Sequence, residues 1–165
     1  MKNQENPQLN KVKELVESIR IAMMTTLDDA GNLVSRPMAV QEMDADGTIW
    51  FFTKKSSPKI DQIEDHEQRI CLSFANVSDS SYVSVTGHAE ELDDRAKIEE
   101  LWSPTAKPWF PNGKDDPELT ILKVTTDMAE YWDSSSSRMV RFFEMARAIV
   151  TGDTYKEGEN EKVVV

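Results

Sequence analysis

The chain has 165 residues and a formal net charge of -11, and 39% of its residues are hydrophobic. This length predicts a single domain, residues 1–165, with a sizeable core. The negative charge argues against binding to nucleic acid or to an anionic membrane, because both would repel the protein. The polar start shows no signal core and no run reaches membrane-spanning length, so we expect a cytoplasmic protein.

The first third of the chain predicts a helix followed by a β-meander. After a frayed tail at residues 1–8, apolar residues recur at helical spacing over Asn10–Ser18. Strands are expected at Ile21–Leu27, Leu33–Met43 and Thr48–Thr53, separated by turns that contain Gly31 and Gly47. Three short antiparallel strands in succession favour a barrel or a sandwich.

The dipeptide Arg36-Pro37 interrupts the second of these strands. Proline has no amide hydrogen to donate, so this point is expected at an edge or a bulge of the sheet. The side chain of Arg36 is then either free to reach a ligand or simply exposed to solvent.

The stretch Trp50–Ile63 predicts a strand, a turn and a helix, Pro58–Gln68, with Ser57 as its N-cap. The turn would gather hydroxyl and ammonium groups near the helix N-terminus, from Thr53, Ser56, Ser57, Lys54, Lys55 and Lys59. Such donors beside the positive end of a helix dipole suit a phosphate. The alternative is a lysine-decorated turn with no ligand.

The second half of the chain continues the sheet. Its predicted elements are strands at Arg69–Asn76, Ser81–Glu90 and Leu119–Trp132, a helix capped by Asp93 that runs through Trp102, and a helix after Ser134–Ser137. Gly87 predicts a bulge, and an irregularity is expected near Asp127. Residues 153–165 are weakly specified: they form a tail, or Val163–Val165 adds to a sheet edge.

The loop Lys107–Asp116 carries Trp109 and Phe110 between prolines. Aromatic side chains on a stiff loop either cover a ligand or partner, or plug one end of the barrel. Both roles are compatible with the sequence.

Catalytic and metal-binding motifs are few. The single cysteine, Cys71, excludes a disulfide framework and is expected to be a small buried core residue. His66 is expected to be solvated, and His88 to be structural because no carboxylate partner is evident. Two distant histidines predict no metal site. The chain has no nucleophile elbow and no glycine-rich nucleotide loop.

Two motifs, Ser35-Arg36-Pro37-Met38 and the run from Phe52 to Lys59, resemble the flavin-binding split barrels of the pyridoxamine 5'-phosphate oxidase superfamily. The later stretches LWSPTAKPWFPNGKDDPELTILKVT and AEYWD are similar to its general stress protein 26 branch. This resemblance implies a mainly β fold, a six-stranded antiparallel split β-barrel with flanking helices. It also implies a homodimer with two FMN sites at the interface.

The resemblance assigns the site residue by residue. Arg36 would contact the FMN phosphate or ribityl chain, and the backbone of Met38 would lie by the ring. Thr53, Ser57 and Lys59 would bind the phosphate. Phe52, which opens the second motif, is included in the predicted cofactor site, and Trp132 would approach the ring from the partner subunit.

Departures from the oxidase pattern bear on function. Gln41 stands where those enzymes have lysine, Tyr82 where they have glutamine, and their C-terminal arginine-histidine motif has no counterpart. Vitamin B6 oxidation is therefore not expected, and no catalytic residue is assigned. The leading hypothesis is an FMN-dependent oxidoreductase of unknown substrate. Its alternatives are a non-catalytic flavin carrier or redox sensor, a deazaflavin-dependent reductase, an FAD protein, and a scaffold without flavin.

Overall fold

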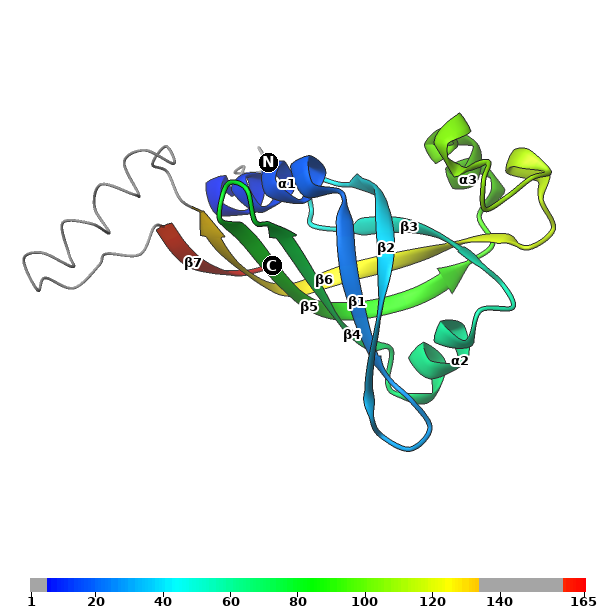
Figure 1. The fold of residues 1–165 in the computed structure, drawn as a ribbon, viewed down its shortest axis with the longest axis horizontal. Helices are drawn as coiled ribbons and strands as arrows, with labels where there is room; N and C mark the ends of the chain where they lie inside the picture. Colours follow the sequence, from blue (N-terminus) through cyan, green and yellow to red (C-terminus); the bar gives the residue numbers. More distant parts are fainter. Residues whose placement is uncertain (1–5, 134–158) are drawn as a thin grey trace, which may run out of the picture.

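The computed structural model describes residues 6–133 and 159–165. Figure 1 shows a strongly curved sheet with short helices packed around it. In chain order, the elements are α1 (Pro7–Ile19), β1 (Ile21–Leu27), β2 (Leu33–Met43), β3 (Ile49–Lys54), α2 (Pro58–Asp65), β4 (Arg69–Asn76), β5 (Ser81–Leu92), α3 (Arg95–Leu101), the 3-10 turns η1 (Pro104–Ala106) and η2 (Gly113–Asp115), β6 (Leu119–Asp133) and β7 (Glu159–Val164).

The sheet closes into a barrel. Its strands are ordered β3-β2-β1-β4-β5-β6-β7, and an additional pairing of β3 with β6 joins the ends of the first six. Every pairing is antiparallel. The predicted six-stranded antiparallel split barrel with flanking helices is confirmed. Strand β7 lies outside the barrel on the free edge of β6, so the sheet-edge alternative for Val163–Val165 is correct.

Helix α1 begins earlier than its apolar spacing suggested. The side chain of Asn6 accepts hydrogen bonds from the amides of Gln8 and Leu9, and Pro7 occupies the first turn. This cap makes residues 6–8 part of the helix rather than of a frayed tail. Residues 1–5 lie outside the described part of the chain.

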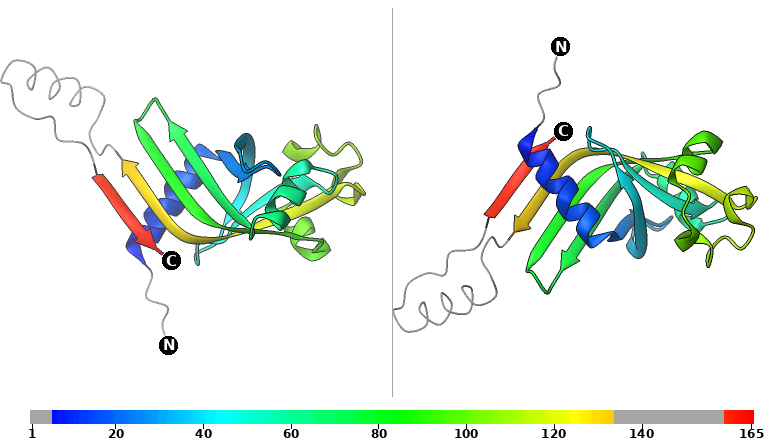
Figure 2. Two further views of the ribbon diagram at one scale, coloured as in Figure 1. Left: turned by 90° about the horizontal axis from the view of Figure 1, so that it is seen from below. Right: turned by 90° about the horizontal axis from the view of Figure 1, so that it is seen from above.

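The buried face of α1 completes the main core. Leu9, Val12 and Val16 pack with side chains that point inward from the barrel strands, among them Phe51 and Tyr131. The two views in Figure 2 show α1 lying obliquely across the strands. Burial of this apolar stripe against the sheet is what holds a short helix in place.

Strand β3 is buried on both faces, which accounts for its continuous aromatic run. Phe51 points into the main core, whereas Trp50 points into a second cluster built on α3. The second cluster also contains Ile98, Leu101 and Phe110. Phe52, on the same face of β3 as Trp50, packs against this cluster and reaches the pocket described below.

The bulge expected at Gly87 is present. The register between β5 and β6 shifts between Thr86 and Gly87, which leaves Asp127 as the extra residue of β6. A Cβ atom at Gly87 would lie 2.1 Å from the carbonyl oxygen of Thr125. Glycine is required here because the two backbones approach too closely for a side chain.

Two helix boundaries differ from prediction. Helix α2 ends at Asp65 rather than at Gln68, because Glu67 and Gln68 both adopt left-handed backbone angles. Helix α3 is capped by Asp94, whose carboxylate accepts from the amide of Lys97, and not by Asp93. The helix predicted after Ser134–Ser137 lies outside the described residues.

The surroundings of three single residues differ from expectation, although a structural role for His88 is not contradicted. Cys71 is half-buried rather than in the core, because Ile70 and Leu72 take the inward positions of β4. His66 is not fully solvated, since its Nε2 lies 3.0 Å from the carbonyl oxygen of Asp28. His88 does have a carboxylate partner, with Nδ1 lying 2.8 Å from Asp127 Oδ2. The bulge creates that pair by turning Asp127 outward.

Within residues 6–133 and 159–165, no helix has the length and apolar character needed to cross a membrane.

Candidate functional site

The candidate site lies where strands β2 and β3 diverge. The two strands pair only from Val40 and Phe51 onward, and the first part of β2 pairs with β1 alone. Beyond Phe51, β3 pairs with β6. A register shift between Val40 and Glu42 leaves Gln41 unpaired at the fork. The edge predicted at Arg36-Pro37 is this open side of β2, where a missing amide donor costs nothing.

The fork opens into a pocket of about 730 Å³. This volume falls in the range of small-molecule sites. Its lining includes three cationic side chains and no carboxylate, although the whole chain has a net charge of -11. The cations are Arg36, Lys54 and Lys59. Among the ion pairs of the described residues, none involves these three side chains. The pocket therefore favours an anionic ligand.

Lys59, in the first turn of α2, is the most perturbed of these cations. Its ammonium donates to the hydroxyl oxygens of Thr53 at 2.8 Å and Ser57 at 2.6 Å. Burial, reinforced by the nearby charge of Arg36, lowers the pKa of Lys59 to about 8. An anion bound beside Lys59 would favour the charged form of its ammonium, and this would offset both the burial and the repulsion from Arg36.

Arg36 is held at the same end of the pocket from β2. Its guanidinium donates to the hydroxyl of Thr26 at 2.6 Å and to the side-chain carbonyl of Gln62 at 2.8 Å. Thr26 in turn donates to Gln62 at 2.7 Å. This network turns the guanidinium along the barrel wall, and burial lowers the pKa of Arg36. Arginine stays charged in proteins, so the site keeps its positive end.

The turn between β3 and α2 gathers fewer groups than predicted. Ser57 occupies the N-cap position, but its hydroxyl caps no helix amide and instead accepts from Lys59. Ser56 donates its hydroxyl proton to Glu118. Lys55 turns away to Asp93, with Nζ 2.8 Å from the carboxylate. Five of the six groups therefore line the pocket, and the contact with Asp93 holds only Lys55 outside it.

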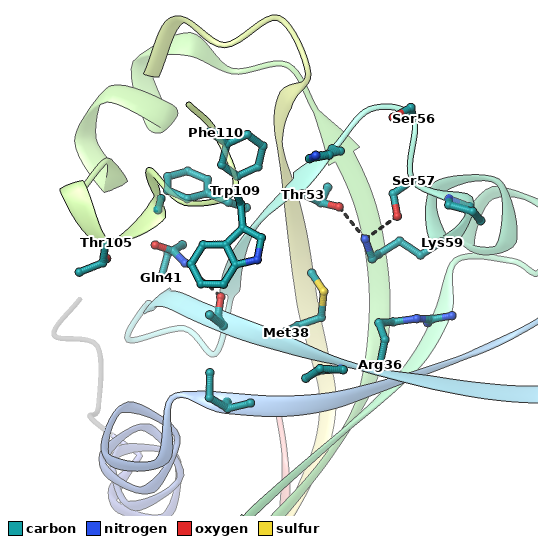
Figure 3. Close-up of a pocket in the computed structure, with 17 residues that line it drawn as sticks. Arg36, Met38, Gln41, Thr53, Ser56, Ser57, Lys59, Thr105, Trp109 and Phe110 are labelled. Atoms are coloured by element: carbon teal, nitrogen blue, oxygen red, sulfur yellow. Dashed lines mark hydrogen bonds between the residues drawn. The ribbon is translucent and has the colours of Figure 1, made fainter. Parts of the chain in front are cut away.

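The other end of the pocket is aromatic. Phe52 lies 6.0 Å from Trp102 and 6.4 Å from Phe110, measured between ring centroids. Trp109 and Phe110 both line the pocket from the Lys107–Asp116 loop. Figure 3 shows Arg36, Ser57 and Lys59 at one end, and Gln41, Thr105 and Trp109 at the other. The pocket thus combines a cationic end with an aromatic end.

The structure brings six of the seven predicted site residues around this one pocket: Arg36, Met38, Phe52, Thr53, Ser57 and Lys59. Their contact with a flavin stays a prediction. Trp132 does not join them, since it lies near the far end of β6, opposite Tyr82. At about 3.3 Å per residue, some 40 Å of strand separates it from Thr120, the partner of Thr53. Trp132 is not among the residues of its own chain that line the pocket.

Gln62 was missed by sequence reasoning. It lies on α2 three residues after Lys59, so both side chains project from neighbouring positions of the same helix face. The three-residue spacing from Lys59 is the feature of the sequence that points to Gln62. No nearby residue indicates that Arg36 lies opposite Gln62. Elsewhere in the described residues, no cluster of three histidine, cysteine or acidic side chains is arranged to hold a metal.

The fold and the site define the class of this protein: a split β-barrel with a cationic pocket, free of carboxylates, at the β2–β3 fork. The family model described as "Pyridoxamine 5'-phosphate oxidase like" matches residues 7–156. The chain therefore belongs to the pyridoxamine 5'-phosphate oxidase-like family, as the sequence resemblance indicated, and to its general stress protein 26 branch.

Relatives agree with this assignment. Protein bli-3 of Neurospora crassa is 29% identical over 154 residues, covering 87% of this chain and 73% of that protein. A solved structure from Jannaschia sp. CCS1, described as a general stress protein 26, has a TM-score of 0.76 at 27% identity and covers 97% of this chain and 100% of its own. The general stress FMN/FAD binding protein of Xanthomonas citri has a TM-score of 0.67 at 30% identity and covers 80% and 93%.

Proposed function

We propose that this protein binds FMN in the pocket at the β2–β3 fork and acts as a flavin-dependent oxidoreductase. The observation that carries the proposal is the charge of the lining: three cations and no carboxylate in an acidic protein. FAD is the nearest alternative cofactor, since the similar protein from Xanthomonas citri is described as binding FMN or FAD.

The residues present fit such a cofactor at both ends. Arg36 and Lys59, with the hydroxyls of Thr53 and Ser57, offer charge-assisted hydrogen bonds to a phosphate. The open edge of β2 at Met38 and the aromatic side chains of the loop suit a planar ring. The volume of about 730 Å³ accommodates both parts of one ligand.

Redox chemistry would come from the cofactor rather than from the protein. The described residues that line the pocket include no histidine, cysteine, aspartate or glutamate. Lys59 is the one lining group whose pKa is brought near neutrality, and it lies at the phosphate end. When bound, a flavin supplies hydride or electron transfer, while this chain's side chains bind, orient and shield it.

We also propose a homodimer, in which the site is completed by a second copy. Ile21, Met23, Tyr82 and Met128 are exposed apolar side chains on the outward face of the barrel. Grouped apolar side chains on one face favour burial against a partner. In that arrangement Trp132 approaches the ring from the partner subunit.

The test is an absorbance spectrum of the purified protein after incubation with FMN and removal of free ligand. A retained and shifted flavin spectrum supports the proposal and justifies assays of nicotinamide-driven reduction. If neither FMN nor FAD is retained, the flavin proposal fails, and a deazaflavin or a ligand-free scaffold takes its place. Retention of FMN with no turnover under any electron donor would favour a flavin carrier or redox sensor.

A further inference from the structure

Trp109 occupies an unusual place for a tryptophan. Its side chain is 64% exposed, yet it lines the mouth of the pocket. Exposing so large an apolar surface is unfavourable, and tryptophan at such positions is enriched where a ligand or partner covers it. Figure 3 shows its indole extending from the loop toward β2, on the side of Gln41 and Met38.

The loop that presents Trp109 is anchored. The next residue, Phe110, is only 4% exposed and packs edge-on against Phe52, with the ring planes at 79°. Farther along, the buried carboxylate of Asp116 accepts hydrogen bonds from the amides of Glu118 at 3.0 Å and Asn112 at 3.4 Å. The two neighbouring aromatic residues thus differ: Phe110 is buried in the second cluster built on α3, whereas Trp109 stays exposed.

Anchoring matters because it fixes the backbone that carries the indole before any ligand arrives. A tryptophan side chain has only two rotatable torsions, so it loses little conformational entropy when it stacks on a ligand. The indole stands at the end of the pocket away from Lys59 and Arg36. A ligand whose phosphate lies beside Lys59 and Arg36 would therefore extend its other end toward the indole.

We propose that Trp109 is the same-chain residue that recognises the planar ring of the ligand, by stacking on it at the pocket mouth. This inference rests on the proposed flavin function and assigns a different part of the ligand to each end of the site. Lys59 recognises the phosphate and Trp109 recognises the ring. Specificity for a phosphorylated aromatic compound then comes from requiring both ends at once.

Calorimetric titrations of three ligands with the full chain test this division. FMN carries both parts, riboflavin carries the ring alone, and ribose 5-phosphate carries the phosphate alone. Trp109→Ala should weaken FMN and riboflavin by about tenfold, the loss of one stacking contact, and leave ribose 5-phosphate unchanged. Trp109→Phe should restore most of the affinity, because a ring remains.

Lys59→Met is the matched control with the opposite pattern. It should weaken FMN and ribose 5-phosphate while leaving riboflavin unchanged. Because Trp109 is exposed, its replacement should not shift the midpoint of thermal unfolding, and this is measured on each variant. A structural role would instead weaken all three ligands together.

The outcomes separate the two proposals. If wild-type protein binds FMN and Trp109→Ala binds it equally well, Trp109 is not a ring contact and the flavin function stands. If Trp109→Ala keeps FMN affinity but dissociates the dimer, the indole is an interface residue and this inference is overturned. If wild-type protein binds none of the three ligands, both proposals fail together.

Discussion

The ammonium of Lys59 donates to the buried hydroxyl of Thr53 across 2.8 Å, joining the first turn of α2 to the end of β3. This contact ties the phosphate end of the pocket to the barrel wall. It also keeps a positive charge where burial and Arg36 both disfavour it. An unfavourable charge retained in a pocket indicates a binding role rather than a stabilising one.

Replacing Lys59 by methionine should weaken FMN binding by about 1.5–3 kcal/mol, the worth of a charge-assisted hydrogen bond to phosphate. Lys55→Met is the control, because Lys55 pairs with Asp93 outside the pocket. That variant should change affinity by less than about 0.5 kcal/mol. Fluorescence titration measures the FMN affinity of both variants. Equal losses of affinity would indicate that Lys59 acts through long-range electrostatics and not through direct contact with the phosphate.

Binding should also depend on pH through Lys59, whose pKa is lowered to about 8 from 10.5. Above pH 8 the free protein loses this proton, so the affinity for ribose 5-phosphate should fall as the pH rises. Between about pH 8 and 10.5 the unfolded chain binds more protons than the folded one, so the free energy of unfolding should rise. Titrations and urea unfolding measure the two trends. Lys59→Met should lack both, and a variant that follows the wild-type curve would exclude Lys59 as their source.

Gln62 is expected to position Arg36 rather than to touch the ligand. Gln62→Ala removes the acceptor held by the guanidinium and should weaken FMN binding by about 1 kcal/mol. Arg36→Lys should cost more, since an ammonium cannot reproduce the two directed contacts to Thr26 and Gln62. Double-mutant cycles measure the coupling, and strictly additive losses would separate Gln62 from Arg36.

Gly87 and Gly31 should respond differently to alanine. At Gly87 the added Cβ meets backbone at 2.1 Å, so Gly87→Ala should cost about 3 kcal/mol or more through overpacking. At Gly31 nothing lies within 4 Å, and only its φ of +80° is unfavourable. Gly31→Ala should therefore cost about 1 kcal/mol. Urea unfolding compares the two, and similar values would contradict a special role for the bulge.

Trp132 should affect flavin only through a second copy of the chain. Trp132→Ala should alter the spectrum of bound FMN and leave the affinity for ribose 5-phosphate intact. Met23→Asp, on the exposed face of β1, should convert a dimer into a species near the chain mass of 18.8 kDa and abolish the same spectral feature. Sedimentation and absorbance measure these effects. A wild-type monomer that binds FMN normally would remove Trp132 from the site.

The sequence by itself determined the local framework. Strands Ile21–Leu27, Leu33–Met43 and Arg69–Asn76 were predicted with the bounds observed, because alternating burial and turn residues act over a few positions. The bulge at Gly87 and the placement of Thr53, Ser57 and Lys59 at one strand-to-helix turn are equally local. Such features depend on backbone angles and near neighbours, which the order of residues specifies directly.

Only the tertiary structure decided which of these groups share a site. Barrel closure brings Gln62 to Arg36, draws Lys55 away to Asp93, and pairs His88 with Asp127. It also buries Phe110 and leaves Trp109 at the pocket mouth, although the two are adjacent in sequence. The physical reason is that these contacts join residues far apart in the chain or divide neighbours between core and solvent. Their geometry exists only after the sheet has closed and the two cores have packed.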